Sequence, residues 1–291
     1  MDIVTIYEQF PTDSSCITYL EEIRWPGGPV CPYCHSSAKI SARTTGHRYH
    51  CNNCNASFSV TVGTIFHDTK LDLQKWFLAI SLILNAKKGI SSRQLMRDIK
   101  VNKNTAWYMA MRIRRAMKEQ PELLQGFIEA DETYVGGKPR KGNGPKDGEP
   151  HKRGRGTDKI PVIGVVERGG NVKAKVAKNL KAKTLASFIR DKVEIKDATV
   201  ITDEFSGYCR LKYFVNHETI NHQETYVCGN IHTNNIESFW AILKRGIIGQ
   251  FHKVSAHYLN KYVDEFCYRY NNRKNPAVFE LTLARAVAGR A

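Results

Sequence analysis

The chain has 291 residues, 42% of them hydrophobic and 10% aromatic, which is enough apolar material for one large or two to three small cores and excludes a disordered chain. The formal net charge of +16 and the pI near 9.5 indicate a polyanionic partner, with nucleic acid as the first candidate and a merely basic enzyme as the alternative. The longest apolar stretch, residues 77–84, is too short to span a bilayer, so no membrane partner is expected.

The first ten residues include Asp2 and Glu8 and lack the basic start and apolar run of a secretory signal. We therefore expect an intracellular protein in a reducing compartment. Four of the eight cysteines form two close pairs, and in such a compartment this spacing favours a metal site over disulfides.

The paired cysteines are two C-x-x-C motifs separated by 16 residues, Cys31 with Cys34 and Cys51 with Cys54. This spacing predicts a zinc ribbon with a four-thiolate structural Zn²⁺ site over residues 1–62, including an N-terminal extension. A thioredoxin-like redox pair is the alternative, but it would leave the second motif unexplained.

A helical region, residues 63–122, follows. Apolar periodicity predicts helices over residues 71–86, 91–99 and 104–117, an order that resembles a helix-turn-helix. The alternative is a plain helical bundle with a solvated basic face. On the first hypothesis, the residues that contact DNA would be Lys103, Asn104, Thr105, Arg112 and Arg115.

Beyond Pro121 the pattern changes to strands. Strands are predicted over residues 126–135, 160–167, 171–177 and 198–202, and a helix over 182–193. Strands that alternate with helices indicate an α/β sheet covered on both faces.

Two acidic residues lie where such a sheet places chemistry: Asp131 in the first strand and Asp203 directly after the last. A single Asp at a strand end is more often a turn or cap residue. Three acids on separate elements, with Glu237 as the third, favour a catalytic site instead.

Residues 231–246 predict a helix with an apolar face. Glu237 and Lys244, seven residues apart, would lie two turns along one line. Asn234 followed by Glu237 also fits a capping box, which is a purely structural alternative.

A basic loop, residues 136–159, separates Asp131 from the next strand and is rich in Gly, Pro, Lys and Arg. A solvated linker is one interpretation. The other is a clamp on a phosphate backbone, formed by Arg140, Lys152, Arg153 and Arg155.

Taken together, the motifs resemble an insertion-sequence transposase of the DDE type, in the zinc-ribbon group related to the eukaryotic Merlin elements. The resemblance covers nearly the whole chain. Its segments are the C-x-x-C pairs, FSVTVGTIFHDTKL at 58–71, ADETYVGG at 130–137, TDEFSGY at 202–208, HTNNIESFWAILKRGI at 232–247 and DEFCYRYNNR at 264–273.

The family implies a ribonuclease-H-like catalytic domain, here residues 123–291, in which two Asp and a third residue hold Mg²⁺ or Mn²⁺. Asp131 and Asp203 match the first two positions. Either Asn234 or Glu237 matches the third, and Glu237 is favoured because the metal prefers anionic oxygen. Lys244 follows in the same motif.

The implied function is a transposase that binds the terminal inverted repeats of its element, cleaves DNA and joins 3′ ends to target double-stranded DNA, as a homo-oligomer in the bacterial cytoplasm, at the nucleoid. No G-x-x-x-x-G-K-[ST] motif suggests ATP use. A catalytically inactive DNA-binding regulator and a ribonuclease-H-like nuclease that cuts without joining are the alternatives.

Overall fold

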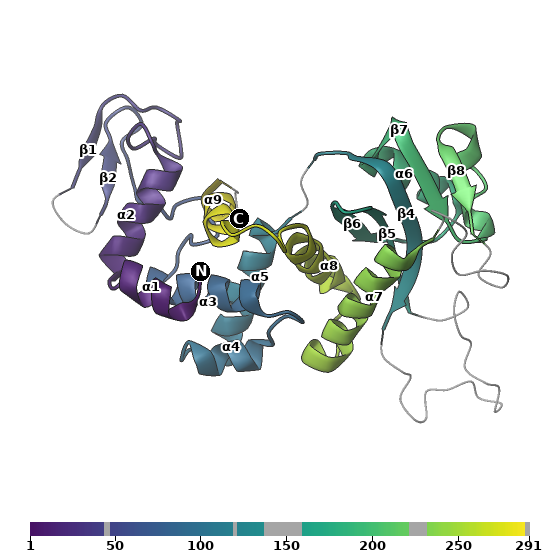
Figure 1. Cartoon of the computed structure of the whole chain (residues 1–291). Coiled ribbons are helices and arrows are strands. Elements are labelled where there is room, and N and C mark those ends of the chain that lie inside the picture. Colours follow the sequence, from purple (N-terminus) through teal and green to yellow (C-terminus); the bar gives the residue numbers. More distant parts are fainter. Residues whose placement is uncertain (44–46, 119–120, 137–158, 221–231, 289–291) are drawn as a thin grey trace. The chain divides into compact units, whose positions relative to one another are not determined.

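The computed structural model describes residues 1–43, 47–118, 121–136, 159–220 and 232–288. The chain forms two compact units, one of Met1–Lys118 with Lys274–Ala291 and the other of Glu119–Arg273 (Figure 1). Residues 274–291 thus belong to the same unit as the start of the chain. The domain bounds predicted from the sequence, 1–62, 63–122 and 123–291, remain predictions.

The N-terminal unit opens with two helices and a small antiparallel sheet in the order β1-β2-β3. Helix α2 begins at a capping box between Thr12 and Ser15. Strands this short bury little. The ring of Trp25 packs on those of Tyr49 and Phe58, at 5.6 and 5.8 Å between ring centroids. The elements are α1 (Ile3–Gln9), α2 (Asp13–Arg24), β1 (Ile40–Ala42), β2 (Tyr49–Cys51) and β3 (Ala56–Phe58).

Three further helices confirm the predicted helical region: α3 (Leu73–Asn85), α4 (Ser92–Asp98) and α5 (Lys103–Ala116). Side chains start the second and third, because Ser91 accepts from Gln94 N and Asn102 accepts from Thr105 N. A tight turn joins α4 to α5 and places Lys100 at φ +52°. The last helix of the chain, α9 (Val278–Ala288), packs against α2, α3 and α5.

The C-terminal unit contains a five-stranded mixed sheet in the order β6-β5-β4-β7-β8. The first three strands are antiparallel neighbours, and β4-β7 and β7-β8 are parallel pairs. The predicted strands are all present, and the short edge strand β8 was not predicted. The strands are β4 (Leu124–Val135), β5 (Ile160–Glu167), β6 (Val172–Val176), β7 (Val193–Thr202) and β8 (Asn216–Thr219).

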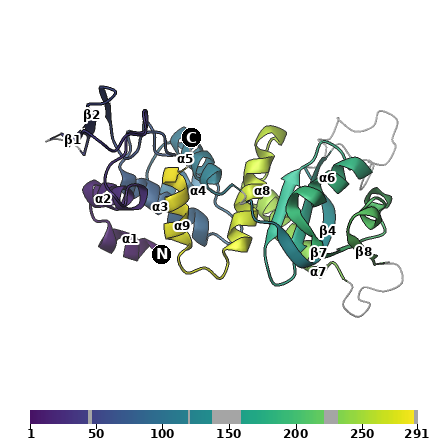
Figure 2. The same ribbon diagram turned by 90° about the horizontal axis from the view of Figure 1, so that it is seen from above.

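Helices cover both faces of this sheet (Figures 1 and 2). On one face, α6 (Ala182–Lys192) shares a core with Ile128, Val200 and other strand residues. On the other, α7 (Asn234–Gly246) and α8 (Ala256–Asn271) form a second core with β5 and β6. The α/β fold with both faces covered, predicted for this region, is confirmed.

Side chains of α8 also hydrogen-bond to the backbone of β6, an edge strand of the sheet. Asn260 Oδ1 accepts from Val176 N at 3.1 Å, and Asn271 both accepts from Val172 N and donates to Val172 O. These amide side chains occupy backbone groups of β6 that an edge strand would otherwise offer to another chain.

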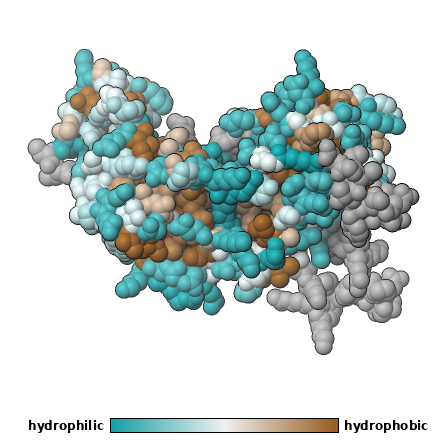
Figure 3. Space-filling model, viewed as in Figure 1, coloured by the Kyte–Doolittle hydropathy of each residue, from teal (hydrophilic) through white to brown (hydrophobic). Residues whose placement is uncertain are grey.

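No helix in the described residues is long and apolar enough to cross a membrane. Hydrophilic side chains, in teal, cover most of the face drawn in Figure 3, and the brown hydrophobic ones form smaller patches.

Candidate active site and metal centres

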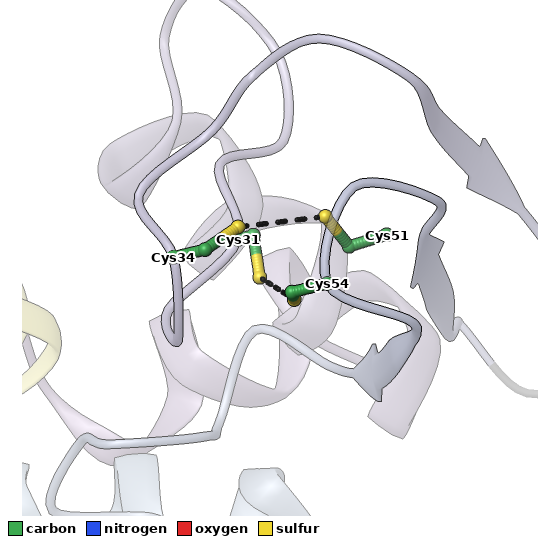
Figure 4. Close-up of side chains that lie close together, drawn as sticks. All are labelled: Cys31, Cys34, Cys51 and Cys54. Carbon is green, nitrogen blue, oxygen red and sulfur yellow. Dashed lines mark hydrogen bonds between the residues drawn. The ribbon is translucent and has the colours of Figure 1, made fainter.

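The four cysteines predicted to bind zinc converge in the small N-terminal sheet. Their sulfur atoms all lie within 4.8 Å of one another, and all four are free thiols. Cys31 Sγ is 3.6 Å from Cys54 Sγ, and Cys34 Sγ is 3.6 Å from Cys51 Sγ. Figure 4 shows the sulfurs of the two motifs pointing toward one another.

These distances fit a tetrahedral metal site. With Zn–S bonds of about 2.3 Å, a regular tetrahedron separates its sulfurs by about 3.8 Å. A disulfide needs sulfurs about 2 Å apart, so the observed spacing matches metal ligands instead. Cys31 and Cys51 are fully buried, Cys34 is half-buried and Cys54 is exposed.

In the C-terminal unit, Asp131 lies on the central strand β4, opposite Gly164 of β5. The indole of Trp240, from α7, donates from Nε1 to Asp131 Oδ2 at 3.0 Å. The same ring lies directly over Gly164, where an added Cβ would come within 2.6 Å of it. The absence of a side chain at Gly164 therefore lets Trp240 lie flat enough to reach the carboxyl group.

The environment of Asp131 opposes its negative charge. Burial, and then the neighbouring Glu132 and Asp203 carboxylates, raise the pKa of Asp131 to about 7, although the Trp240 hydrogen bond acts in the opposite direction. A divalent cation bound beside Asp131 would lower this pKa again and so favour the ionised carboxylate.

Asp203 directly follows β7, at the end of a strand parallel to β4, as the sequence predicted. Phe205 N donates to Asp203 Oδ1 at 3.0 Å and orients the carboxylate. Beside it, the buried hydroxyl of Tyr208 donates to Glu132 Oε2 at 3.0 Å. Asp131, Glu132, Asp203 and Tyr208 thus form one electrostatic group, because all three acids raise the pKa of Tyr208.

The predicted third acid lies on the first turn of α7, where Glu237 is exposed and accepts from Thr233 Oγ1 at 3.0 Å. Asn234 is exposed as the first helical residue. The capping-box alternative is wrong in its detail, because Thr233 is the N-cap and makes no side-chain cap bond to the backbone. Lys244 is exposed two turns further along α7.

The residue that caps α7 is one that the sequence analysis did not single out. Glu129, on β4, is completely buried. Its Oε2 accepts from the backbone N–H of Asn235 at 2.8 Å and of Ile236 at 3.1 Å. Its Oε1 accepts from Asn235 Nδ2 at 2.8 Å and from Arg168 Nε at 2.9 Å. In the sequence, the one sign of this role is that Glu129 is a charged residue beside the apolar residues of a predicted strand.

The three predicted acids do not gather as tightly as the cysteines. Among the residues that the structure describes, the cysteine cluster is the one group of three or more potential ligands that meets the 4.8 Å limit. Asp131 and Asp203 are close enough for the charge of Asp203 to raise the pKa of Asp131. Glu237 lies on α7, the helix whose Trp240 contacts Asp131.

The predicted DNA-contacting residues of α5 divide into two groups. Lys103, Asn104 and Arg115 are exposed, and Thr105 is half-buried. Arg112 is buried, with an exposed fraction of 8%. Its Nη1 donates to the carbonyls of two residues before α3, Ile65 and His67, at 2.8 and 2.6 Å. This arginine therefore holds α5 against the segment before α3, and its contact with DNA stays a prediction.

The predicted basic clamp lies outside the described residues. Its residues, Arg140, Lys152, Arg153 and Arg155, all fall within 137–158.

Comparisons with known proteins agree with these features. Residues 123–271 match the family model described as an ISXO2-like transposase domain, and residues 11–57 match a transposase zinc-ribbon domain. The chain is 31% identical over 251 residues to an uncharacterized protein in the transposable element ISH50 of Halobacterium salinarum, covering 81% of this chain and 83% of that protein.

Solved structures show weaker similarity. One is the Mos1 transposase paired-end complex with the left transposon end, at 13% identity and a TM-score of 0.29, covering 74% of this chain and 80% of that one. Another is the Mos1 strand transfer complex, at 11% identity and a TM-score of 0.26, covering 72% and 78%. The family assignment therefore rests on the sequence matches and the topology: the chain belongs to the ISXO2-like transposases, with a zinc ribbon before a ribonuclease-H-like catalytic domain.

Proposed function

We propose that this protein binds the terminal inverted repeats of its own insertion sequence, cleaves the DNA there and joins the 3′ ends to target DNA. The observation that carries the proposal is the acidic group around Asp131 and Asp203 in a domain of the ISXO2-like transposase family. Joining two ends requires them to be held together, so at least two copies are expected in the active complex. Kinship with the Merlin elements remains a prediction.

Asp131 and Asp203 would hold the catalytic Mg²⁺ or Mn²⁺. When bound, the cations activate an attacking hydroxyl and stabilise the leaving oxygen of the phosphodiester. Carboxylate oxygens are the ligands that these ions prefer. The chain's own residues prepare the site: Trp240 orients Asp131, and Phe205 N orients Asp203.

The third ligand is proposed to be Glu237 rather than Asn234. The helical period turns successive residues by about 100°, so Glu237 points about 60° from Trp240 and Asn234 about 120° from it. Because Trp240 contacts Asp131, the side chain nearer in direction to Trp240 is better placed to join Asp131. Comparing Glu237→Gln with Asn234→Ala in a joining assay tests this choice.

End recognition is assigned to the N-terminal unit, with Zn²⁺ in the cysteine cluster. The exposed Lys103 and Asn104 and the half-buried Thr105, at the start of α5, would lie near base edges, and Arg115 near phosphates. The capped turn between α4 and α5 supports a helix-turn-helix. The loop of residues 136–159 is proposed to clamp the phosphate backbone beside the catalytic site, on its composition alone.

A strand-transfer assay with end-sequence DNA and Mg²⁺ tests the proposal. We expect joined product from the wild type, and at least about a hundredfold loss in Asp131→Asn and Asp203→Asn with DNA binding retained. Joining that survives either substitution would contradict the metal site. Cleavage without joining would favour a nuclease, and binding without cleavage would favour a regulator.

A further inference from the structure

The buried carboxylate of Glu129 has no place in the proposed chemistry, yet it accepts four hydrogen bonds from α7 and Arg168. We propose that Glu129 is a positioning residue, which anchors the first turn of α7 to β4 and thereby sets the place of Glu237 relative to Asp131. This inference rests on the proposed function, because Glu237 and Asp131 are the acids that it would hold in register.

The anchor lies on the most firmly held part of the sheet. Glu129 belongs to the central strand, where its backbone pairs with Val166 of β5 and Ile201 of β7. Residues two apart on a strand share a face, so Glu129 and Asp131 both point toward α7. Glu129 contacts the first turn of that helix, and Asp131 contacts Trp240 in its second turn. Two carboxylates of one strand therefore hold one helix at two points.

The anchor suits a carboxylate, since the four groups that hydrogen-bond to Glu129 from α7 and Arg168 are all donors. The two backbone amides at the start of α7 donate to Oε2, and Asn235 Nδ2 and Arg168 Nε donate to Oε1. Glutamine has the same shape, but in either orientation its NH₂ group would face donors. A negative charge also complements the positive end of the helix dipole.

Arg168 extends the anchor to the segment before the helix. Its Nη2 donates to the carbonyl of His232 at 2.9 Å, while its Nε donates to Glu129. His232 Nδ1 itself lies 3.2 Å from Glu129 Oε1. The chain is thus held on both sides of Thr233, the N-cap of α7, and Glu237 N donates to Thr233 O at 3.2 Å. The position of Glu237 follows from this fixed start of the helix.

The test compares Glu129→Gln with Glu265→Gln in the full chain. Glu265 is a matched control, because it is equally buried in the same unit and lies 3.1 Å from Arg269, but on α8. Amide hydrogen exchange of α7 and α8 is measured in both variants. We expect about tenfold faster exchange at the start of α7 in Glu129→Gln, with α8 unchanged, and no change in α7 in Glu265→Gln.

Trp240 supplies a second readout, since it is the one tryptophan in residues 119–273. Its indole N–H resonance, assigned by its loss in Trp240→Phe, is expected to shift in Glu129→Gln toward its position in Asp131→Asn, and to stay in place in Glu265→Gln. In the joining assay, turnover by Glu129→Gln should fall about a hundredfold with unchanged affinity for end DNA, as displaced catalytic groups predict.

Unchanged exchange at the start of α7 in Glu129→Gln, or equal loosening of α7 and α8, would overturn the inference. If Glu129→Gln does not fold, Asn235→Ala removes a single donor to Oε1 and should give a smaller change confined to α7; no change there would count equally against the anchor. A wild-type protein without joining activity would overturn the proposed function alone, since exchange and the indole resonance do not depend on turnover.

Discussion

At the scale of single residues, the charge of Asp131 links catalysis to stability. Its pKa is raised to about 7, first by burial and then by Glu132 and Asp203, from an ordinary value of 3.8. The folded protein therefore keeps a proton that the unfolded chain releases. Without a bound cation, this group makes stability fall as pH rises from about 4 to about 7.

Asp131→Asn removes that cost and should stabilise the protein at pH 8 in buffer without added Mg²⁺. Because the side chain is partly exposed, we expect a gain on the order of 2 kcal/mol in the free energy of unfolding, and no gain near pH 4. Urea denaturation at the two pH values measures it. Asp191→Asn, on an exposed position of α6, is the control, and an Asp131→Asn protein that is less stable at pH 8 would contradict the argument.

Two arginines of α5 are expected to differ in role, one in stability and the other in DNA binding. Arg112 is buried against the carbonyls of Ile65 and His67, so Arg112→Ala should cost about 2–3 kcal/mol by leaving these acceptors without a partner. Arg115 is exposed, so Arg115→Ala should change stability by less than about 0.5 kcal/mol but weaken binding to end DNA and reduce its salt dependence. Thermal melts and binding titrations at two salt concentrations measure both. Equal destabilisation by the two substitutions would show that burial does not distinguish them.

At the scale of elements, the ribbon depends on its metal. Strands β1, β2 and β3 have three residues each, too few to form a stable core alone. Cys31→Ser should therefore release stoichiometric zinc and increase proteolysis within residues 26–60, while α3 to α5 stay protected. Cys209→Ser, at an exposed cysteine outside the cluster, should do neither. Metal analysis and limited proteolysis measure the effects, and full zinc retention in Cys31→Ser would refute the site.

The elements also show how far the sequence could predict the fold. The helices α3 to α7 and the strands β4 to β7 followed from apolar periodicity, because each buries one continuous face or run. Strand β8 has four residues with no buried apolar member, so it carries no such pattern. The acids Asp131 and Asp203 were predicted from strand positions and the family motifs. The role of Glu129 could not be predicted, because its hydrogen-bond partners are distant in the sequence. Arg168 is 39 positions away, and Asn235 is more than 100 positions away.

At the scale of the whole molecule, the two compact units do not follow one another along the chain. The chain leaves the N-terminal unit after Lys118 and returns to it at Lys274, so the catalytic unit is an insertion between α5 and α9. Helical periodicity does not state which core a helix joins. The packing of α9 against α2, α3 and α5 could therefore not be predicted from the sequence.

This topology makes a prediction about α9. Phe279 is fully buried, and its ring lies 5.8 Å from that of Phe77 on α3; Ala286 O accepts from Ile65 N. Phe279→Ala should cost the N-terminal unit about 3–5 kcal/mol through the cavity it creates. Hydrogen exchange should then increase in α2, α3 and α5 but not in β4 or β7, and DNA binding should weaken with it. A matched substitution in the catalytic unit, Phe188→Ala on α6, removes an equally buried ring and should loosen β4 and β7 instead. If Phe279→Ala loosened the catalytic sheet and left α2 and α3 protected, α9 would belong to the domain that the sequence alone assigned to it.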